Sequence, residues 1–269
     1  MLLRRVEYAR AENVPDAVRL LSEHSNARPL AGGQTLVNVM KARAAAPDVL
    51  VDLNGIDELK GIRTTRPGGL ELGAMATYTE IVESEDVGDF RPLLAKVTHT
   101  IADVQVRNRG TLGGNLCSND PTNHLPPLMV AMDAQMTIAA SGGERTVPAE
   151  DFFLGVYLTA VEPGELLTKV TIPPPRGGDG FAAVTIGREG TCIVNAAAVV
   201  DDGEARLAIG CVSAVPVLVQ APSEPDAAAA AVTASDFDPP SDVHASAAYR
   251  RRLAEVLARR AVQQARGGR

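Results

Sequence analysis

Residues 110–121, GTLGGNLCSNDP, are the stretch from which the rest of the sequence is best interpreted. Three glycines, a threonine, two asparagines and an aspartate make the segment polar and conformationally permissive, which is typical of a loop around a phosphate-bearing ligand. Leu112 and Leu116 interrupt it and the apolar residues 125–129 follow, so it does not resemble a flexible linker. We predict an ordered ligand loop. The alternative is a glycine-rich turn that binds nothing, which is the commoner explanation of a single Gly-Gly pair.

A second glycine pair lies near the N-terminus. Residues 28–30 predict a short strand, residues 31–35 (AGGQT) a glycine turn, and the apolar spacing over residues 36–43 a helix. Gly32 and Gly33 can adopt backbone angles closed to other residues, and the first turn of the helix offers unpaired N–H groups. This arrangement favours anion binding, although its spacing matches neither GxGxxG nor the P-loop. A tight turn without a ligand is the alternative.

Composition and charge exclude several classes of protein. The 269 residues have room for two or three domains, and a hydrophobic content of 45% is close to the globular average. A net charge of −7 without a dense basic face argues against nucleic-acid binding. The basic residues Arg250, Arg251, Arg252, Arg259 and Arg260 lie on a predicted helix, as a solvated or partner-facing stripe. No apolar run reaches membrane-span length and no signal-peptide stretch is present, which predicts a soluble, cytoplasmic protein.

The cysteines and histidines predict no metal site in this chain. Cys117, Cys192 and Cys211 are far apart and form no CxxC motif, which argues for a reducing compartment and against a disulfide framework. They are also too few for an iron–sulfur cluster with four ligands. The four histidines have neither HxxxH nor HExxH spacing. Any metal redox chemistry would therefore reside on another chain.

The remaining pattern predicts an α+β protein. The best domain boundary is residues 173–180, where three prolines and three glycines follow a strand. Helices are expected at residues 14–22, 78–83, 93–102, 125–132 and 246–264, with the alanine tract 227–231 as a short helix or a linker. Strands are expected at residues 49–53, 59–63, 70–75, 134–139, 145–147, 165–172, 181–186, 193–200 and 205–212.

Four passages of the chain together resemble one known family. They are PLAGGQTLVNVMKAR (29–43), VQVRNRGTLGGNLCSNDP (104–121), GVYLTAVEPGELLTKVTIP (155–173) and PSDVHASAAYRRRLAEVLARRAV (240–262). With these passages the chain is similar, nearly end to end, to the FAD-carrying medium subunit of the molybdenum hydroxylases, the family of xanthine dehydrogenase and aerobic carbon monoxide dehydrogenase. The resemblance implies a two-part FAD-binding domain of the p-cresol methylhydroxylase type, over residues 1–55 and 56–175. A small α+β domain of the CO dehydrogenase flavoprotein type, an antiparallel sheet with a covering helix, would follow over residues 176–269.

The resemblance also implies a set of cofactor-binding residues, with the two glycine segments on opposite sides of the FAD pyrophosphate. Asp120 would bond a polar part of the ligand such as a ribose hydroxyl, or would cap a helix ahead of Pro121. The chain departs from the family at His124, where relatives commonly carry Asp, and near the flavin ring, where it offers Arg188 and Cys192 in place of Lys or Tyr. The assigned residues are Ala31, Gly32, Gly33, Gln34, Thr35, Thr111, Leu112, Gly113, Gly114, Asn115, Asp120, His124, Leu167 and Arg188.

The function implied by the resemblance is that of a FAD-carrying electron-transfer subunit in an oxidoreductase complex. A large partner with the molybdenum cofactor would oxidise the substrate, and a small partner with two [2Fe-2S] clusters would pass the electrons to FAD on this chain. An external acceptor would then take them, and two heterotrimers would form a heterohexamer. No residue of this chain would be a catalytic acid, base or nucleophile, because the cofactor carries the redox step. The alternatives are a self-contained FAD oxidase of the same fold and a scaffold subunit without FAD.

Overall fold

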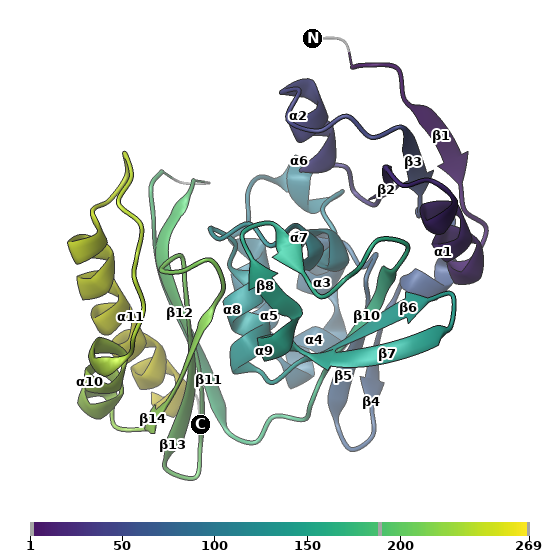
Figure 1. The fold of residues 1–269 in the computed structure, drawn as a ribbon. Coiled ribbons are helices and arrows are strands. Elements are labelled where there is room, and N and C mark those ends of the chain that lie inside the picture. Colours follow the sequence, from purple (N-terminus) through teal and green to yellow (C-terminus); the bar gives the residue numbers. More distant parts are fainter. Residues whose placement is uncertain (1–2, 188–189, 268–269) are drawn as a thin grey trace.

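The computed structural model describes residues 3–187 and 190–267. Its N-terminal part is a small parallel sheet in the order β1-β3-β2, with the fully buried β3 in the centre (Figure 1). The helix α1 packs Ala17, Val18 and Leu21 into the core beneath this sheet, and the Asn13 side chain caps its first turn. The elements are β1 (Glu7–Arg10), α1 (Val14–Glu23), β2 (Ala27–Leu30), α2 (Leu36–Lys41), β3 (Val49–Asp52) and the 3-10 turn η1 (Asp57–Leu59).

The central part is a five-stranded antiparallel sheet in the order β4-β5-β10-β6-β7. Short helices lie between this sheet and the C-terminal sheet in Figure 1, and their apolar side chains form the largest of the core clusters. The elements are β4 (Ile62–Thr65), β5 (Gly69–Gly73), α3 (Tyr78–Glu83), α4 (Glu85–Phe90), α5 (Pro92–His99), α6 (Val104–Arg107), α7 (Leu112–Ser118), α8 (Leu125–Ala131), β6 (Gln135–Ala140), β7 (Gly143–Pro148), α9 (Ala149–Phe152), β8 (Phe153–Gly155), β9 (Leu158–Thr159) and β10 (Leu166–Ile172).

The C-terminal part is a four-stranded antiparallel sheet in the order β11-β12-β13-β14. Helices α10 and α11 cover its outer face, while α8 of the central part packs against β12 and β13 on the inner face (Figure 1). Ala197 and Ala208 of this sheet belong to the central core, so the two parts share a continuous apolar contact. The elements are β11 (Gly178–Thr185), β12 (Cys192–Asp201), β13 (Glu204–Gly210), β14 (Val217–Pro222), α10 (Pro225–Ala234) and α11 (Ala247–Gly267).

The α+β fold is confirmed, but the structure differs from the expectations at several points. Residues 112–118 form the helix α7 and not a loop, because Leu112 and Leu116 are both fully buried one turn apart. The fourth strand, β14, was not expected at all. Arg250 is not part of a solvated stripe: it is buried and donates hydrogen bonds to the carbonyl oxygens of Ile193 and Cys211. The alanine tract 227–231, expected as a short helix or a linker, is helical and lies within α10.

Within the described part of the chain, none of the helices is long and apolar enough to cross a lipid bilayer.

Candidate cofactor-binding site

The first glycine segment, residues 31–35, joins the end of β2 to the start of α2. Gly33 has φ +73°, a left-handed conformation that favours glycine, and the Asn54 side chain holds the segment by donating to the Ala31 carbonyl oxygen at 3.3 Å. In residues 3–187 and 190–267 no hydrogen bond is donated by the backbone amides of residues 32–35. Four N–H groups on one turn are therefore available to an anionic ligand.

The second glycine segment, residues 110–115, differs in that its amides are occupied. All four N–H groups of residues 112–115 donate hydrogen bonds of 2.8 to 3.0 Å within the protein. These N–H groups could bond a ligand only if their internal hydrogen bonds broke. The segment therefore offers a ligand a surface to pack against and no free amide donors from residues 112–115. The acceptors are, in order, the carbonyl oxygens of Ala76 and Ala74, the hydroxyl of Thr111 and the carbonyl oxygen of Thr111.

The tertiary structure brings the two segments into contact. A Cβ atom added to Gly32 would lie 1.8 Å from the carbonyl oxygen of Arg109, which immediately precedes the second segment. Gly113 fits equally closely against Ala74, where an added Cβ would lie 2.7 Å from the Ala74 Cβ. Gly114 is exposed, and an added Cβ would meet only the Thr111 hydroxyl, at 2.8 Å. Gly32 and Gly113 thus serve close backbone packing, while Gly114 leaves an open surface.

Asn115 is fixed in the protein interior. Its Nδ2 donates to the Tyr78 hydroxyl at 3.0 Å, and burial raises the pKa of Tyr78 to about 12. The Asn115 Oδ1 is buried without a hydrogen-bond partner in the described structure. The side chain therefore connects α7 to α3 and presents one unpaired acceptor.

Asp120 and Tyr157 form the rim of the site beyond α7. One Asp120 oxygen accepts from both the backbone N–H and the hydroxyl of Thr122, at 2.9 and 2.7 Å, and the other accepts from the Tyr157 hydroxyl at 3.3 Å. The alternative that Asp120 caps a helix is wrong, because α8 begins only at Leu125 and His124 is its N-cap residue.

His124 lies where the central part meets the C-terminal sheet. Its ring contacts Phe181 edge to face at 5.4 Å, and its Nδ1 is 3.3 Å from the Asn195 Nδ2. The ring lines a pocket of about 360 Å³ between α5 and β11. Leu167 is buried in the central core on β10. Arg188 lies outside the described residues.

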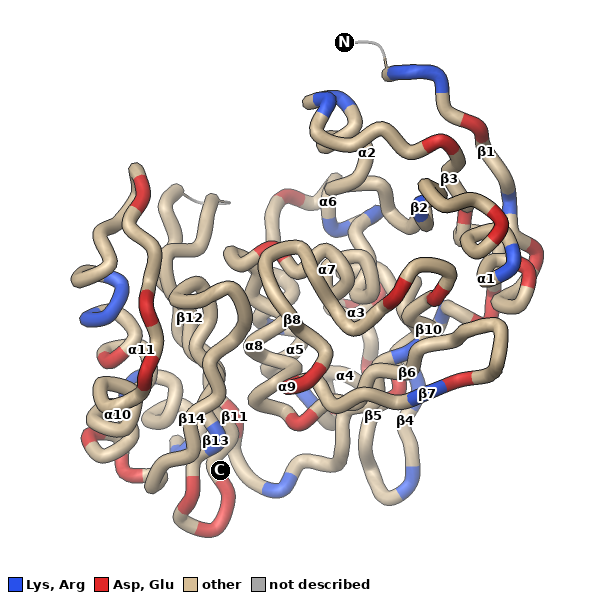
Figure 2. Tube along the Cα trace, viewed as in Figure 1, with Lys and Arg blue, Asp and Glu red and all other residues tan. Residues whose placement is uncertain are grey.

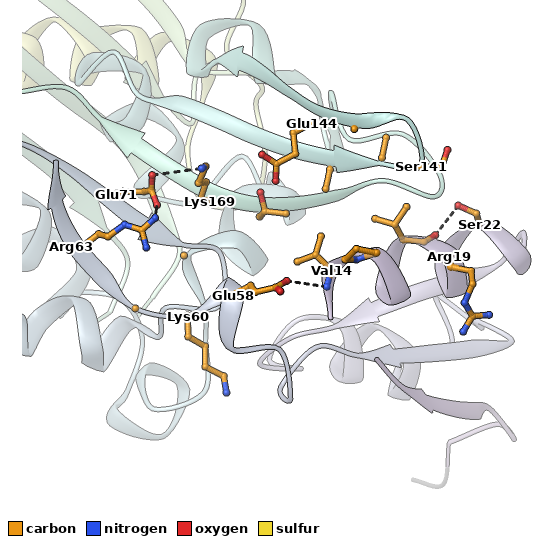
Figure 3. A pocket seen from close by; sticks show the side chains of 18 of the residues that line it. Val14, Arg19, Ser22, Glu58, Lys60, Arg63, Glu71, Ser141, Glu144 and Lys169 are labelled. Atoms are coloured by element: carbon orange, nitrogen blue, oxygen red, sulfur yellow. Dashed lines mark hydrogen bonds and ion pairs between the residues drawn. The ribbon is translucent and has the colours of Figure 1, made fainter. Parts of the chain in front are cut away.

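A separate groove of about 1000 Å³ runs between α1 and the five-stranded sheet (Figure 3). Several of its charged side chains have partners within the protein: Glu71 bridges Arg63 and Lys169, and Glu58 accepts from the Val14 N–H at 3.3 Å. None of the described residues assigned to the cofactor lines it. The two glycine segments therefore define a different site.

Basic residues near the glycine segments are few. Figure 2 shows Lys and Arg at the end of α2 and around α6, interspersed elsewhere with Asp and Glu along the chain. Arg107 on α6 is engaged with the carbonyl oxygens of Ile101 and Ala102, at 3.0 and 2.6 Å. Arg109, directly before the second segment, is exposed, so this region offers both backbone amides and basic side chains to a phosphate group.

The chain matches two known protein families, one over each of its parts. Residues 4–175 match the family described as "FAD binding domain in molybdopterin dehydrogenase", and residues 181–265 match "CO dehydrogenase flavoprotein C-terminal domain". Both parts of the chain thus match domains that occur in flavoproteins. It belongs to the family of FAD-binding medium subunits of the molybdenum hydroxylases.

Individual relatives resemble the chain over nearly its whole length. The carbon monoxide dehydrogenase medium chain of Afipia carboxidovorans is 37% identical over 278 aligned residues, covering 97% of this chain and 96% of that protein. The glyceraldehyde dehydrogenase medium chain of Sulfolobus acidocaldarius is 32% identical, with 96% and 97% covered. The structure of CO dehydrogenase from Oligotropha carboxidovorans superposes with a TM-score of 0.91 at 33% identity, covering 99% of both chains.

Some residues near the site were not found from the sequence. Asn195, fully buried on β12, contacts the Asn123 carbonyl oxygen and the His124 ring, and Tyr157 bonds Asp120. A single asparagine inside the apolar run of residues 192–200 was the available signal for the first of these. No local signal marked Tyr157, because its partner lies far away in the sequence.

Proposed function

We propose that this chain holds FAD at the two glycine segments and acts as the electron-transfer subunit of a molybdenum hydroxylase complex. The observation that carries the proposal is the set of four amides on residues 32–35 that donate no hydrogen bond in the described structure, on a segment whose Gly32 packs against Arg109 and Gly110. When bound, FAD supplies the redox chemistry, and the residues of this chain bind it and orient it. No other group of this chain needs to act as an acid or a base.

In this proposal different residues bind different parts of FAD. The amides of residues 32–35 bond the pyrophosphate, and Gly114 lets it approach α7 closely. Asp120, supported by Tyr157, bonds a ribityl or ribose hydroxyl, and His124 lies toward the C-terminal sheet. The remaining assigned residues keep the roles that the family resemblance implies: Ala31, Thr111, Leu112, Gly113, Asn115, Leu167 and Arg188.

The proposed complex follows from the relatives, which are medium chains and subunits by name. A large partner carries the molybdenum cofactor and a small partner carries two [2Fe-2S] clusters, in a cytoplasmic dimer of heterotrimers. Within the chain, residues 1–55 and 56–175 form the two parts of the FAD-binding domain and residues 176–269 the C-terminal domain. The named relatives are medium chains of a carbon monoxide dehydrogenase and of a glyceraldehyde dehydrogenase. Because similar medium chains occur with such different substrates, we propose that the large partner selects the substrate.

The test is flavin retention by the purified chain. We expect flavin absorption that is released as FAD on denaturation. The Gly114→Val variant should lose at least about tenfold in FAD affinity, because its side chain occupies the surface that the pyrophosphate must approach. The matched control is Gly88→Val, a valine on the exposed face of α4 with open space around it.

Both variants should unfold cooperatively in urea, which separates loss of binding from loss of fold. If folded Gly114→Val keeps flavin at the wild-type level, the pyrophosphate does not bind at this surface. A folded wild-type chain that refuses added FAD, alone and with its co-expressed partners, would favour the scaffold subunit instead.

A further inference from the structure

Two cysteines that are separate in the sequence meet behind His124. Cys192 begins β12 and Cys211 follows the end of β13, and both side chains are buried, at 1% and 6% exposure. One nitrogen, the Asn195 Nδ2, lies 3.5 Å from the Cys192 Sγ and 3.6 Å from the Cys211 Sγ. Both thiols are free, so the two cysteines do not form a disulfide bond in the structure. The sequence analysis had considered them only as isolated residues.

Two further features mark this cluster. Cys211 has φ +67°, a left-handed conformation that costs a residue with a Cβ atom free energy. The Asn195 Oδ1 is fully buried and has no hydrogen-bond partner in the described structure. Backbone strain and an unpaired acceptor thus lie at the same place as the two thiols.

The two thiols differ in acidity. Against the effect of burial, the neighbouring Cys211 thiol and then the His124 ring lower the pKa of Cys192. The neighbouring Cys192 and burial together raise the pKa of Cys211 well above its ordinary value. Cys192 is therefore the more acidic thiol of the pair, which matches the division between an attacking and a resolving cysteine.

A pocket lies close to this pair. The pocket of about 360 Å³ is lined by His124, Phe181, Ala183 and Thr185. The Cys192 Sγ lies 3.6 Å from the carbonyl oxygen of Val184, which stands between the last two of these residues in the sequence. The strand residues on either side of the group that contacts the sulfur therefore belong to the wall of the pocket, and a molecule as small as hydrogen peroxide is the oxidant that suits such a buried sulfur.

We propose that Cys192 and Cys211 form a peroxide-reactive site that closes reversibly to a disulfide. The Cys192 thiolate attacks one oxygen of hydrogen peroxide, the O–O bond breaks, and the leaving hydroxide takes up a proton as water. The Cys211 sulfur then attacks the resulting sulfenic acid, the S–O bond breaks, and the second water leaves with the thiol proton. In sum two thiols and one peroxide give one disulfide and two waters, and the two electrons come from the cysteine pair.

Cys117 provides an internal control for this proposal. It lies on α7, and burial raises its pKa to about 12, so that it is a neutral thiol at physiological pH. Thiolate character governs reaction with peroxide, so Cys192 should be lost at least about tenfold faster than Cys117. The cysteine readout does not require bound FAD, and because His124 is also assigned to the cofactor, disulfide formation and flavin retention are measured separately.

The experiment treats the purified, folded chain with hydrogen peroxide and maps its cysteines by mass spectrometry after alkylation in denaturant. We expect a peptide that links Cys192 to Cys211, restored to free thiols by dithiothreitol, while Cys117 stays reduced. In Cys211→Ser the Cys192 sulfenic acid should persist and react with dimedone. In His124→Gln the loss of Cys192 should slow several-fold.

Two results would overturn the proposal. One is loss of all three thiols at equal rates without the linked peptide in the wild-type chain. The other is the absence of a dimedone adduct on Cys192 in a Cys211→Ser protein that unfolds in urea with the wild-type midpoint. The first result is measured on the wild-type chain alone. The proposal can therefore be tested even if a variant folds poorly.

Discussion

The two glycine segments look alike in sequence and differ in what their backbone does. Residues 31–35 keep four amides without acceptors in the described structure, whereas residues 112–115 use every amide within the protein. The first segment is a turn between a strand and a short helix, and the second is the first turn of a helix docked on the end of β5. A Gly-Gly pair can thus either expose donors or permit close packing, and the partners of its amides decide which.

The largest expected effect is at Gly113, which should behave as a packing residue. Gly113→Val places a branched side chain against Ala74 in the interior, and we expect a loss of at least about 3 kcal/mol in the free energy of unfolding. Gly114→Val, one residue along the same helix, should lose only about 1 kcal/mol, through disturbance of the Thr111 cap. Urea denaturation of both variants measures the difference, and equal losses would break the distinction between the two glycines.

A smaller effect is expected at Tyr78, which anchors the second segment to α3. Tyr78→Phe removes the acceptor of the Asn115 Nδ2 and leaves a buried amide without a partner, at a cost of about 2 kcal/mol in the free energy of unfolding. The matched control is Tyr249→Phe on the exposed side of α11, which should be neutral. If Tyr78→Phe is also neutral by urea denaturation, α7 is held by its backbone contacts alone.

The smallest effect compares the two threonines that precede the helices. The Thr111 hydroxyl accepts from the Gly114 N–H at 3.0 Å, while Thr35 makes no side-chain cap bond. Thr111→Ala should therefore lower the free energy of unfolding by about 1 kcal/mol, and Thr35→Ala should change it by less than about 0.5 kcal/mol. We expect Thr35→Ala to weaken FAD binding instead, as measured by fluorescence titration. A larger stability loss for Thr35→Ala would show that the first segment also serves packing.

Much of the fold could be predicted from the sequence because local signals carry it. Alternating apolar residues located most strands, and Pro173 with its neighbours ended β10 where expected. The unexpected helix α7 had a readable signal in Leu112 and Leu116, which one turn of helix brings to the same side. The two glycines between these leucines favoured a loop instead, because glycine is unfavourable inside a helix.

The cofactor site could be predicted only in part. The sequence indicated both glycine segments, and their contact through Gly32 and Arg109 is observed, while the individual cofactor contacts stay predictions. Arg250 was placed on the surface because charged side chains usually lie there. Its actual partners are the carbonyl oxygens of Ile193 and Cys211 and the carboxylate of Asp242, which no helical pattern could reveal.

The sequence by itself determined the family, the α+β class and the positions of the two glycine segments, since these depend on residue types and short spacings. Only the tertiary structure decided which amides stay free and which are consumed. The acceptors for residues 112 and 113 are carbonyl oxygens of Ala76 and Ala74, from a segment remote in the chain. The meeting of Cys192 and Cys211 at Asn195 has the same origin, because hydrogen bonds and thiol contacts are set by distances in space.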